Sequence, residues 1–341
     1  MALPLLPTSL VGSYALPGWL HAGMEKEAAG AFGVSDAEEM YLDATRVALA
    51  DQREAGVDIL CDGEYRRRHF ILNFFRRFEG VTRLEPLRKV GSAAYDMIPR
   101  FRLEGRLAAR GGLGIVEEHR ILRGLAGGAP VKICCPGALT LSRPVAEIGD
   151  YRDRGELLSD MAGIVNGELR ALAGAGADYI QIDEPRFSHH DGEMGEIVAL
   201  LNQMTRGVRA RIALHVCFGN YFNKSLDERT YRRLFPALLE SGVAEFCLEF
   251  ANRNFVELEI AREIAEAGKT LGFGCVDVKS CWVEPPQFVA GQIRRLLEAV
   301  PPERVRVIPD CGFNHTARPI AQAKMAAMVE GARIVRRELA G

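Results

Sequence analysis

Short apolar runs alternate with longer amphipathic stretches along most of the chain. The runs are rich in β-branched residues, whereas the stretches between them place apolar residues at positions i, i+3 and i+4, the spacing of a helix with one buried face. Strands that alternate with helices predict a parallel sheet. The predicted strands are residues 8–12, 59–64, 131–136, 179–184, 212–217, 246–250, 270–278 and 305–311, and the predicted helices between them include residues 38–55, 155–173, 193–209 and 286–299.

Eight such units predict a closed α/β barrel, the (β/α)8 or TIM barrel, that spans residues 1–341 as one catalytic domain. An open doubly wound sheet is the alternative. Residues 79–128 form a connection that is too long for one barrel crossover and contains Gly111 and Gly112. We therefore expect an inserted hairpin and helix after the second strand, overhanging the active face.

Composition and charge narrow the classes of partner. The chain is 48% hydrophobic and 26% charged, which is ordinary for a soluble globular protein, and its net charge of -2 argues against nucleic-acid binding. No run approaches the ~20 apolar residues of a membrane span, and the N-terminus lacks a signal-peptide pattern. We therefore expect a cytoplasmic protein without membrane contacts, whose eight cysteines are reduced thiols with a few as metal ligands.

A histidine and a cysteine share one face of a predicted strand. His215 and Cys217 lie two residues apart in the run 212–217, and alternate side chains of a strand point to the same side. Glu249 and Cys311 end two later runs, and a barrel gathers the C-terminal ends of its strands at one rim. Imidazole, thiolate and carboxylate groups all bind zinc, so these four residues predict a zinc site. Each of the two later residues also has an interpretation that involves no metal. Glu249 could form a salt bridge with Arg253, and Cys311 could be a buried thiol beside a turn.

The predicted zinc site has the pattern of a reactive site. The cysteines of structural zinc sites usually come in closely spaced pairs, whereas these ligands are scattered over three strands. Because a zinc-bound thiol loses its proton, we expect the site to supply a thiolate nucleophile at neutral pH. The carboxylate ligand, Glu249, would be displaced from the zinc by an incoming substrate thiol.

Two acids end other predicted strands, where barrels place their chemistry. Glu64 and Asp183 could bind an ammonium group, act as general acid or base, or form ion pairs with the arginines at 66–68. Ser13 closes a glycine turn whose hydroxyl and amides could hold a carboxylate. Phosphate binding is the alternative for such a turn, although no Walker or dinucleotide-binding fingerprint is present.

These motifs together resemble the catalytic half of cobalamin-independent methionine synthase, within the uroporphyrinogen-decarboxylase-like barrel superfamily. The resemblance implies a barrel with Zn²⁺ held by His215, Cys217, Glu249 and Cys311. It also implies that Glu64 and Asp183 bind the amino group of homocysteine, with Ser13 near its carboxylate. The matching positions cover most of the chain in order, at residues 11–13, 62–64, 180–185, 215–217, 249 and 309–312.

Two differences from the long synthases bear on the methyl donor. Those enzymes carry a second, amino-terminal barrel that helps to hold a polyglutamyl folate, and we expect no counterpart of it here. They also have a histidine after strand seven that is thought to protonate the leaving folate nitrogen, whereas this chain has Lys279. Lysine is a weak acid unless its pKa is lowered. Lys279 and His315, four residues beyond Cys311, are therefore the candidate catalytic acids.

Three functional hypotheses follow. The first is zinc-dependent methyl transfer to homocysteine, giving methionine. Its donor is methylcobalamin, free or on a corrinoid protein, in preference to 5-methyltetrahydrofolate, because departing Co(I) requires no proton. The second is alkyl transfer to another thiol, as in epoxyalkane:coenzyme M transferase, although coenzyme M has no amine for Glu64 and Asp183 to bind. The third is a non-catalytic barrel that binds zinc or a corrinoid.

Overall fold

The chain forms a closed ring of parallel strands. In the computed structural model, six strands make one sheet in the order β3-β5-β6-β7-β8-β9. The ring is completed by two short segments, in which Thr8 pairs with Val307 and Leu60 pairs with Val131, while residues 9 and 59 pair with each other. The predicted TIM barrel is thereby confirmed. The structure describes residues 3–89, 96–185, 187, 192–220 and 229–341.

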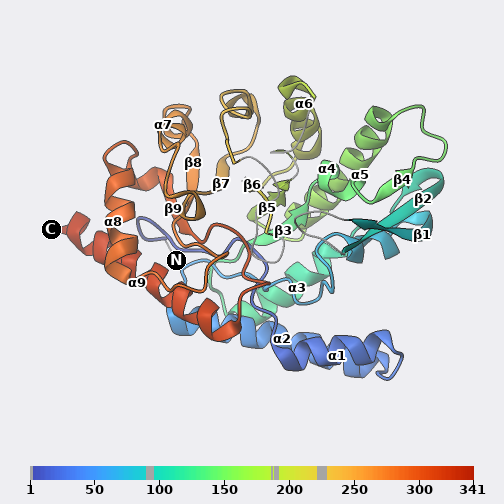
Figure 1. Ribbon diagram of the computed structural model, residues 1–341, viewed down its shortest axis with the longest axis horizontal. Helices are drawn as coiled ribbons and strands as arrows, with labels where there is room; N and C mark the ends of the chain where they lie inside the picture. The colour runs from blue at the N-terminus through green and yellow to red at the C-terminus, as the bar shows by residue number, and fades with distance from the viewer. Residues whose placement is uncertain (1–2, 90–95, 186, 188–191, 221–228) are drawn as a thin grey trace.

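The elements follow the predicted alternation of strands and helices (Figure 1). The strands are β1 Glu79–Lys89, β2 Asp96–Ala108, β3 Ile133–Pro136, β4 Val145–Glu147, β5 Tyr179–Asp183, β6 Arg211–Val216, β7 Glu245–Glu249, β8 Thr270–Gly274 and β9 Val305–Ile308. The α-helices are α1 Gly18–Ala28, α2 Val34–Ala55, α3 Ile115–Ala126, α4 Ala138–Ser142, α5 Arg154–Gly174, α6 Met194–Thr205, α7 Glu259–Glu266, α8 Pro286–Leu297 and α9 Arg318–Ala340. Short 3-10 helices include η1 Leu72–Arg76, η3 Ala237–Glu240, η4 Ala251–Arg253 and η5 Pro302–Arg304.

Several strands are shorter than the apolar runs that predicted them. The runs 8–12 and 59–64 contribute only isolated bridges, and β8 ends at Gly274 rather than at residue 278. β9 ends at Ile308 because Pro309 has no N–H to continue the ladder, and the next backbone N–H, that of Asp310, donates to the carbonyl of Val276. The apolar residues beyond these ends belong to loops at the C-terminal rim.

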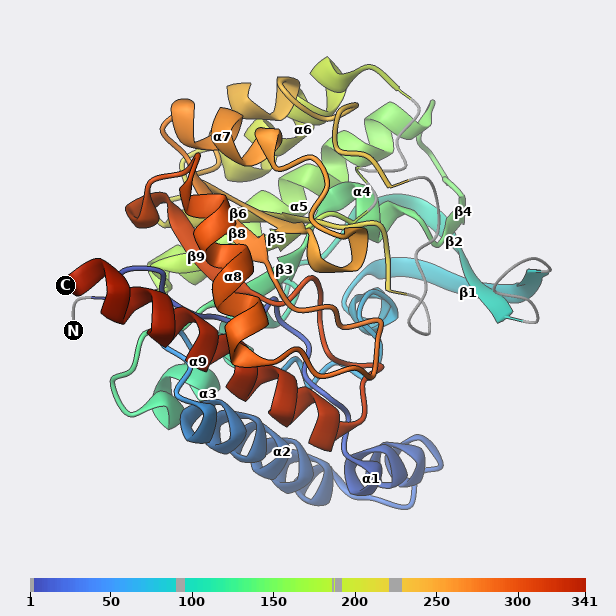
Figure 2. The ribbon, with the colours of Figure 1, turned by 60° about the vertical axis from the view of Figure 1, so that its left-hand side comes forward.

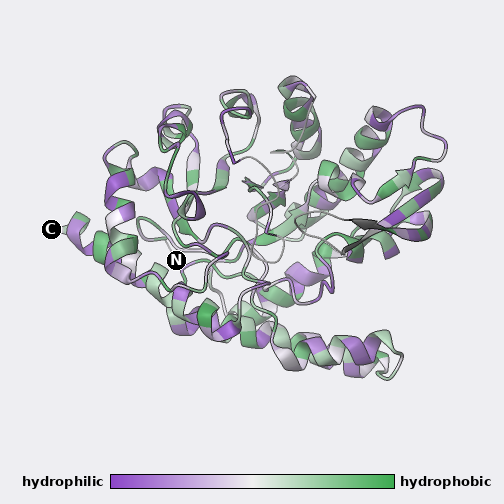
Figure 3. Ribbon diagram, in the orientation of Figure 1, coloured by the Kyte–Doolittle hydropathy of each residue, from purple (hydrophilic) through white to green (hydrophobic). Residues whose placement is uncertain are grey.

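Long helices surround the strands, and the last helix, α9, runs past the first described residues (Figure 2). The guanidinium of Arg336 in α9 donates hydrogen bonds to the carbonyls of Leu5 and Leu6, at 2.8 and 2.9 Å, which ties the last helix to the first described residues. Hydrophilic and hydrophobic residues alternate along outer helices such as α2 and α9 (Figure 3), as expected of helices with one buried face. Among the helices within the described ranges, none is long and apolar enough to cross a membrane.

Residues 79–126 depart from the simple barrel. β1 and β2 pair as an antiparallel hairpin that projects from one side of the molecule in both views, and α3 follows it (Figures 1 and 2). Phe101 of β2 stacks on Phe75 of η1, with ring centroids 4.0 Å apart, and pairs in parallel with Val145 of β4. Residues 90–95, between the two strands, lie outside the described residues. That the hairpin overhangs the active face stays a prediction.

The interior of the barrel contains both apolar and polar layers. Glu245, at the start of β7, is fully buried and accepts hydrogen bonds from the hydroxyl of Tyr179 at 2.5 Å and from Arg211 and Arg306 at 3.1 and 2.6 Å. One carboxylate therefore joins β5, β6, β7 and β9 across the barrel. A small apolar cluster inside the ring consists of Val11, Ile59, Tyr179, Ala213, Cys247 and Ile308.

The carboxylate of Glu245 should be important for stability. We expect Glu245→Gln to lower the free energy of unfolding by about 3 kcal/mol, because the largely buried Arg306 loses its charged partner. The control is Glu338→Gln, which breaks a half-exposed pair with Arg294 and should cost less than about 1 kcal/mol. Urea unfolding midpoints compare the two variants; equal midpoints would contradict the role given to Glu245.

Candidate metal and substrate site

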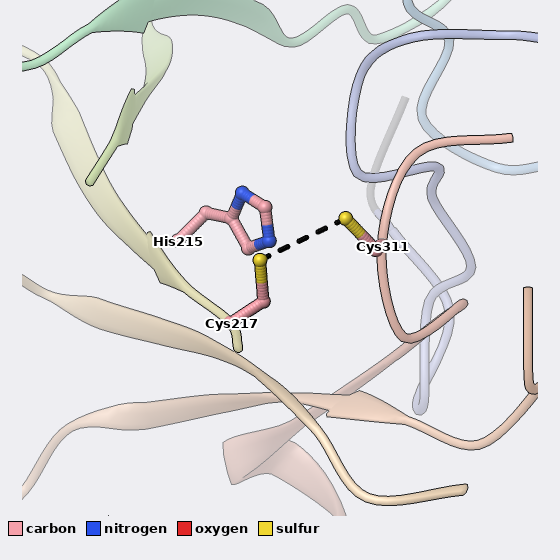
Figure 4. A group of neighbouring side chains, drawn as sticks. All are labelled: His215, Cys217 and Cys311. Atoms are coloured by element: carbon pink, nitrogen blue, oxygen red, sulfur yellow. Dashed lines mark hydrogen bonds between the residues drawn. The ribbon is translucent and has the colours of Figure 1, made fainter. Parts of the chain in front are cut away.

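Three predicted metal ligands meet at the C-terminal rim of the barrel. His215 lies near the end of β6, Cys217 directly follows β6, and Cys311 lies three residues after β9. One ligand atom from each lies within 4.8 Å of the others, and the two Sγ atoms are 3.8 Å apart (Figure 4). The prediction that His215 and Cys217 point to the same side of the strand is therefore confirmed. Closure of the barrel brings Cys311 beside them.

A hydrogen bond fixes the orientation of the His215 ring. Its Nδ1 lies 2.9 Å from Oδ1 of Asp183, and Nε2 points toward the two sulfurs (Figure 4). Buried Nε2 has no hydrogen-bond partner among the described residues. When Nδ1 donates its proton to a carboxylate, Nε2 carries the lone pair that a metal requires.

The sulfur chemistry of the cluster also suits a metal. A hydrogen bond from Cys217 holds the pKa of the Cys311 thiol well below its ordinary value; burial opposes this shift and the neighbouring His215 favours it. This arrangement favours the thiolate form of Cys311 over that of Cys217. Two sulfurs bound to one zinc ion at about 2.3 Å and a tetrahedral angle are about 3.8 Å apart, which agrees with the observed separation. These three residues form a candidate metal site that fits zinc.

Glu249 occupies a different position from the three-residue cluster. Its Oε2 accepts a hydrogen bond from Nζ of Lys279 at 2.8 Å, and both side chains are buried. Its Oε1 is buried and has no partner in the part of the chain that the structure describes. The salt bridge considered with Arg253 is not what forms, because Arg253 pairs with Glu257 instead. That Glu249 is a metal ligand stays a prediction.

A second cluster lies beside the first and contains the two predicted substrate acids. Glu64, Asp183 and Cys134 bring one ligand atom each within 4.8 Å of the others. Asp183 accepts a hydrogen bond from Nε2 of Gln181 at 2.7 Å through the same oxygen that contacts His215. Its other oxygen, Oδ2, is buried without a partner among the residues described here. This buried acceptor could receive an N–H from a bound ligand.

Burial controls the charge of Glu64. It raises the pKa of this carboxyl to about 8, against the lowering effect of Arg67, and the nearby Asp183 contributes to the rise. Arg67 is buried and donates to Glu64 at 3.1 Å, but its stronger contacts are with Glu118, at 2.9 and 2.7 Å. Of the arginines at 66–68, it is therefore Arg67 that forms the ion pair considered as an alternative role for Glu64. A cationic ligand would add the positive charge that favours the ionised carboxylate.

The glycine turn at residues 12–13 runs close to both clusters. A Cβ on Gly12 would come within 2.8 Å of Oε1 of Glu64, and a Cβ on Gly312 would come within 1.9 Å of Oγ of Ser13. The backbone N–H of Phe313 donates to the carbonyl of Ser13 at 2.8 Å. Ser13 therefore lies against the loop that carries Cys311, and a side chain at either glycine would require the neighbouring side chain of Glu64 or Ser13 to shift.

Three residues of the site were missed in the sequence. Gln181 lies between Lys132 and Asp183: the fully buried ammonium of Lys132 donates to its Oε1 at 2.6 Å, and its own Nε2 donates to Asp183. Cys134 is buried and lies in the acidic cluster. Gln181 could have been found, because it alternates with Asp183 on β5. No sequence signal identifies Lys132 or Cys134.

The two candidate catalytic acids differ in their surroundings. Lys279 is buried against Glu249, and this carboxylate raises the lysine pKa although burial opposes the shift. His315 is an exposed residue whose Nε2 lies 3.4 Å from Nδ2 of Asn314. The raised pKa makes Lys279 a poorer acid than ordinary lysine.

The chain is similar to known proteins over almost its whole length. The family model described as the catalytic domain of cobalamin-independent synthase matches residues 6–334. A methionine synthase of Thermococcus kodakarensis is 35% identical over 100% of this chain and 96% of its own, and one of Saccharolobus solfataricus is 33% identical over 99% and 97%. A solved B12-independent methionine synthase of Shewanella sp. W3-18-1, in complex with selenomethionine, superposes with a TM-score of 0.84 at 28% identity, covering 98% of this chain and 99% of that one.

The metal cluster can be tested by zinc content. After dialysis against zinc and removal of the excess, we expect about one zinc per wild-type chain and a large loss in Cys311→Ser, because a thiolate ligand is removed. Cys281→Ser is the control, since Cys281 is exposed and lies outside the cluster. Zinc content is measured by mass spectrometry of the metal. Equal contents in the two variants would show that Cys311 is not a zinc ligand.

The raised pKa of Glu64 predicts a pH dependence. Between the unfolded value of about 4.3 and the folded value of about 8, the folded protein keeps a proton that the unfolded chain has released. Stability should therefore fall as pH rises through this window, and Glu64→Gln should lose about 3 kcal/mol less than wild type between pH 5.5 and 8. Urea unfolding at both pH values measures the difference, with Glu338→Gln as control; parallel curves would show that Glu64 is not protonated in the folded state.

Proposed function

Because this chain belongs to the family of cobalamin-independent methionine synthase catalytic domains, we propose that its His/Cys/Cys cluster holds zinc and that homocysteine is methylated there. The chain is a methyltransferase that forms methionine from homocysteine. The observation that carries the site assignment is the 2.9 Å hydrogen bond between Asp183 and His215. It joins the acidic cluster to the metal cluster, so one substrate can reach both.

The acidic cluster suits the ammonium group of homocysteine. Asp183 has a buried, unpartnered Oδ2 within the described part of the chain, and Glu64 lies in the same cluster. An entering ammonium group would supply hydrogen bonds to these oxygens and a positive charge in addition to that of Arg67, whose stronger contacts are with Glu118. We assign the substrate carboxylate to Ser13, whose hydroxyl lies beside Gly312 and hence next to Cys311.

Orientation follows from these contacts. Holding the ammonium at Glu64 and Asp183 directs the side chain of homocysteine toward His215, Cys217 and Cys311. Zinc bound there would keep the substrate sulfur deprotonated at neutral pH. The chain's own contribution is to bind the amino acid by its charged groups and to hold its sulfur in position for displacement.

Methylcobalamin, free or carried on a protein, is the donor that we propose. The sulfur forms a bond to the methyl carbon while the cobalt–carbon bond breaks, and both electrons of that bond stay on cobalt as Co(I). This leaving group takes no proton, whereas the nitrogen of 5-methyltetrahydrofolate requires one. The buried ion pair of Lys279 with Glu249 supports this choice, since it removes the most obvious proton donor. We further propose a cytoplasmic location, where thiolates stay reduced.

The donor is tested by supplying homocysteine to the zinc-loaded protein with methylcobalamin or 5-methyltetrahydrofolate in separate reactions. We expect methionine, detected by mass spectrometry, from methylcobalamin and none above background from the folate. A folate-dependent product would overturn the donor assignment and return Lys279 or His315 to the role of acid. If neither donor gives methionine, neither methylcobalamin nor 5-methyltetrahydrofolate is the methyl donor.

The acceptor site is tested with a thiol that lacks the amine. Glu64→Gln should raise the KM for homocysteine about 10-fold, because one charge-assisted contact is lost. The same variant should leave the rate with 4-mercaptobutyrate, which is homocysteine without its amino group, close to that of wild type. If both thiols are affected equally, Glu64 supports the fold of the site and does not bind the ammonium group.

A further inference from the structure

A fully buried lysine lies inside the barrel, one layer below the acidic cluster. Lys132 directly precedes β3 and lies two residues before Cys134, so the two side chains point to the same side of the strand. Its ammonium group donates to the carbonyl of Leu10 at 2.5 Å and to Oε1 of Gln181 at 2.6 Å. Because burial of an ammonium group is costly, these two contacts must compensate for the water that the group has lost.

The ammonium group decides which end of the Gln181 amide faces it. An ammonium group can only donate hydrogen bonds, so Oε1 of Gln181 has to point toward Lys132. Nε2 then points the other way, where it donates to the carbonyl of Val11 and to Oδ1 of Asp183, both at 2.7 Å. A reversed amide would place a donor against the ammonium group and an acceptor against two acceptors. The neighbours thus allow a single orientation of this amide.

The same contacts join the two halves of the proposed amino-acid site. Lys132 and Gln181 hold two consecutive backbone carbonyls of the segment that leads to Ser13. Through the same amide nitrogen, Gln181 also holds Asp183. The segment that carries the proposed carboxylate-binding residue is therefore tied to the proposed ammonium-binding residue.

We propose that Lys132 is a positioning residue for the amino-acid end of homocysteine. Acting through Gln181, it directs an N–H to one oxygen of Asp183, so that the buried Oδ2 stays open to the substrate ammonium, and it keeps Ser13 at the distance that suits the substrate carboxylate. Lys132 has no exposed surface and acts on the substrate only through these neighbours. This inference rests on the proposed function and names what sets the spacing of its two substrate contacts.

A lysine with a purely structural role would behave differently. If Lys132 only stabilised the interior, its loss would lower the free energy of unfolding and weaken the binding of every thiol to the same degree. If it positions Asp183 and Ser13, its loss weakens recognition of the amino and carboxylate groups in particular. Discrimination between homocysteine and thiols that lack one of these groups separates the two roles.

Calorimetry with zinc-loaded protein measures this discrimination. For each variant, the dissociation constant of 4-mercaptobutyrate, which lacks the amino group, is divided by that of homocysteine. We expect Lys132→Met to lower this ratio about 10-fold, because Asp183 is no longer held in position for a charge-assisted hydrogen bond to the ammonium group. The ratio for 3-aminopropane-1-thiol, which lacks the carboxylate, should fall as well; if it does not, the part of the inference that concerns Ser13 is wrong.

The chain offers a matched control in Lys269→Met. Lys269 is a partly buried lysine that also donates to two backbone carbonyls, those of Ser241 and Val243, at 2.8 and 2.7 Å. These contacts lie before the starts of β7 and β8, at the end of the barrel opposite to the site. We expect this variant to lose stability but to keep both ratios of wild type.

A second substitution shows whether the lysine acts through Gln181. Gln181→Met removes the amide and should itself lower the preference for homocysteine, and the double variant replaces the polar pair by two apolar side chains. If Lys132 acts only through the amide, the double variant discriminates no worse than Gln181→Met alone; effects that multiply would overturn the inference. Should Lys132→Met fail to fold because Oε1 of Gln181 is left without a donor, Gln181→Met, the double variant and wild type still decide the inference.

The outcomes also separate the inference from the proposed function. If the wild type binds neither thiol, or binds homocysteine no better than 4-mercaptobutyrate, the proposed homocysteine site is wrong and the inference fails with it. If the wild type prefers homocysteine and Lys132→Met keeps that preference, or weakens both thiols equally, the proposed site stands and Lys132 has only a structural role.

Discussion

The interior of a closed barrel excludes water, so each polar side chain that points into it must find its partner on another strand. This constraint organises the molecule from bottom to top. At the start of the strands, Glu245 is satisfied by Tyr179 and two arginines. Above it, Lys132 and Gln181 satisfy each other, and Gln181 continues the chain of hydrogen bonds to Asp183. At the C-terminal rim, buried side-chain atoms of Asp183, His215 and Glu249 have no hydrogen-bond partner among the described residues. Asp183 and His215 belong to the two clusters of the candidate site.

The two carboxylate oxygens of Asp183 have different roles at this rim. One oxygen orients His215 for a metal, and the other is available to a ligand, so a single carboxylate couples the metal cluster to the substrate cluster. The proposed methyl transfer uses both functions at once, because it places the substrate sulfur at the metal while the charged end of the amino acid is held at the acidic cluster. A short, directional hydrogen bond achieves this coupling with little freedom, and Gln181 restrains the shared oxygen further.

The environment of Lys279 disfavours proton donation by this residue. An ammonium held by a buried carboxylate has little tendency to give up a proton, and Lys279 is held on one side by Glu249 and on the other by a well-bonded loop. The same pair supports the proposed donor, whose leaving group requires no acid. This support depends on the position of one carboxylate, that of Glu249.

The sequence by itself determined the barrel, the approximate positions of its strands and the gathering of His215, Cys217 and Cys311 at one rim. Periodicity reports the local choice between helix and strand, and the alternation along β6 suffices to put His215 and Cys217 on one face. Strand ends were less accurate, because apolar residues such as those at 275–278 continue into loops whose paths are set by Glu284 and Asp310. The pairing of Lys279 with Glu249, the burial of Arg67 and the membership of Cys134 in the acidic cluster were decided only by the tertiary structure. Each joins residues far apart in the chain, and their distances are set by barrel closure and loop conformation, which leave no local pattern in the sequence.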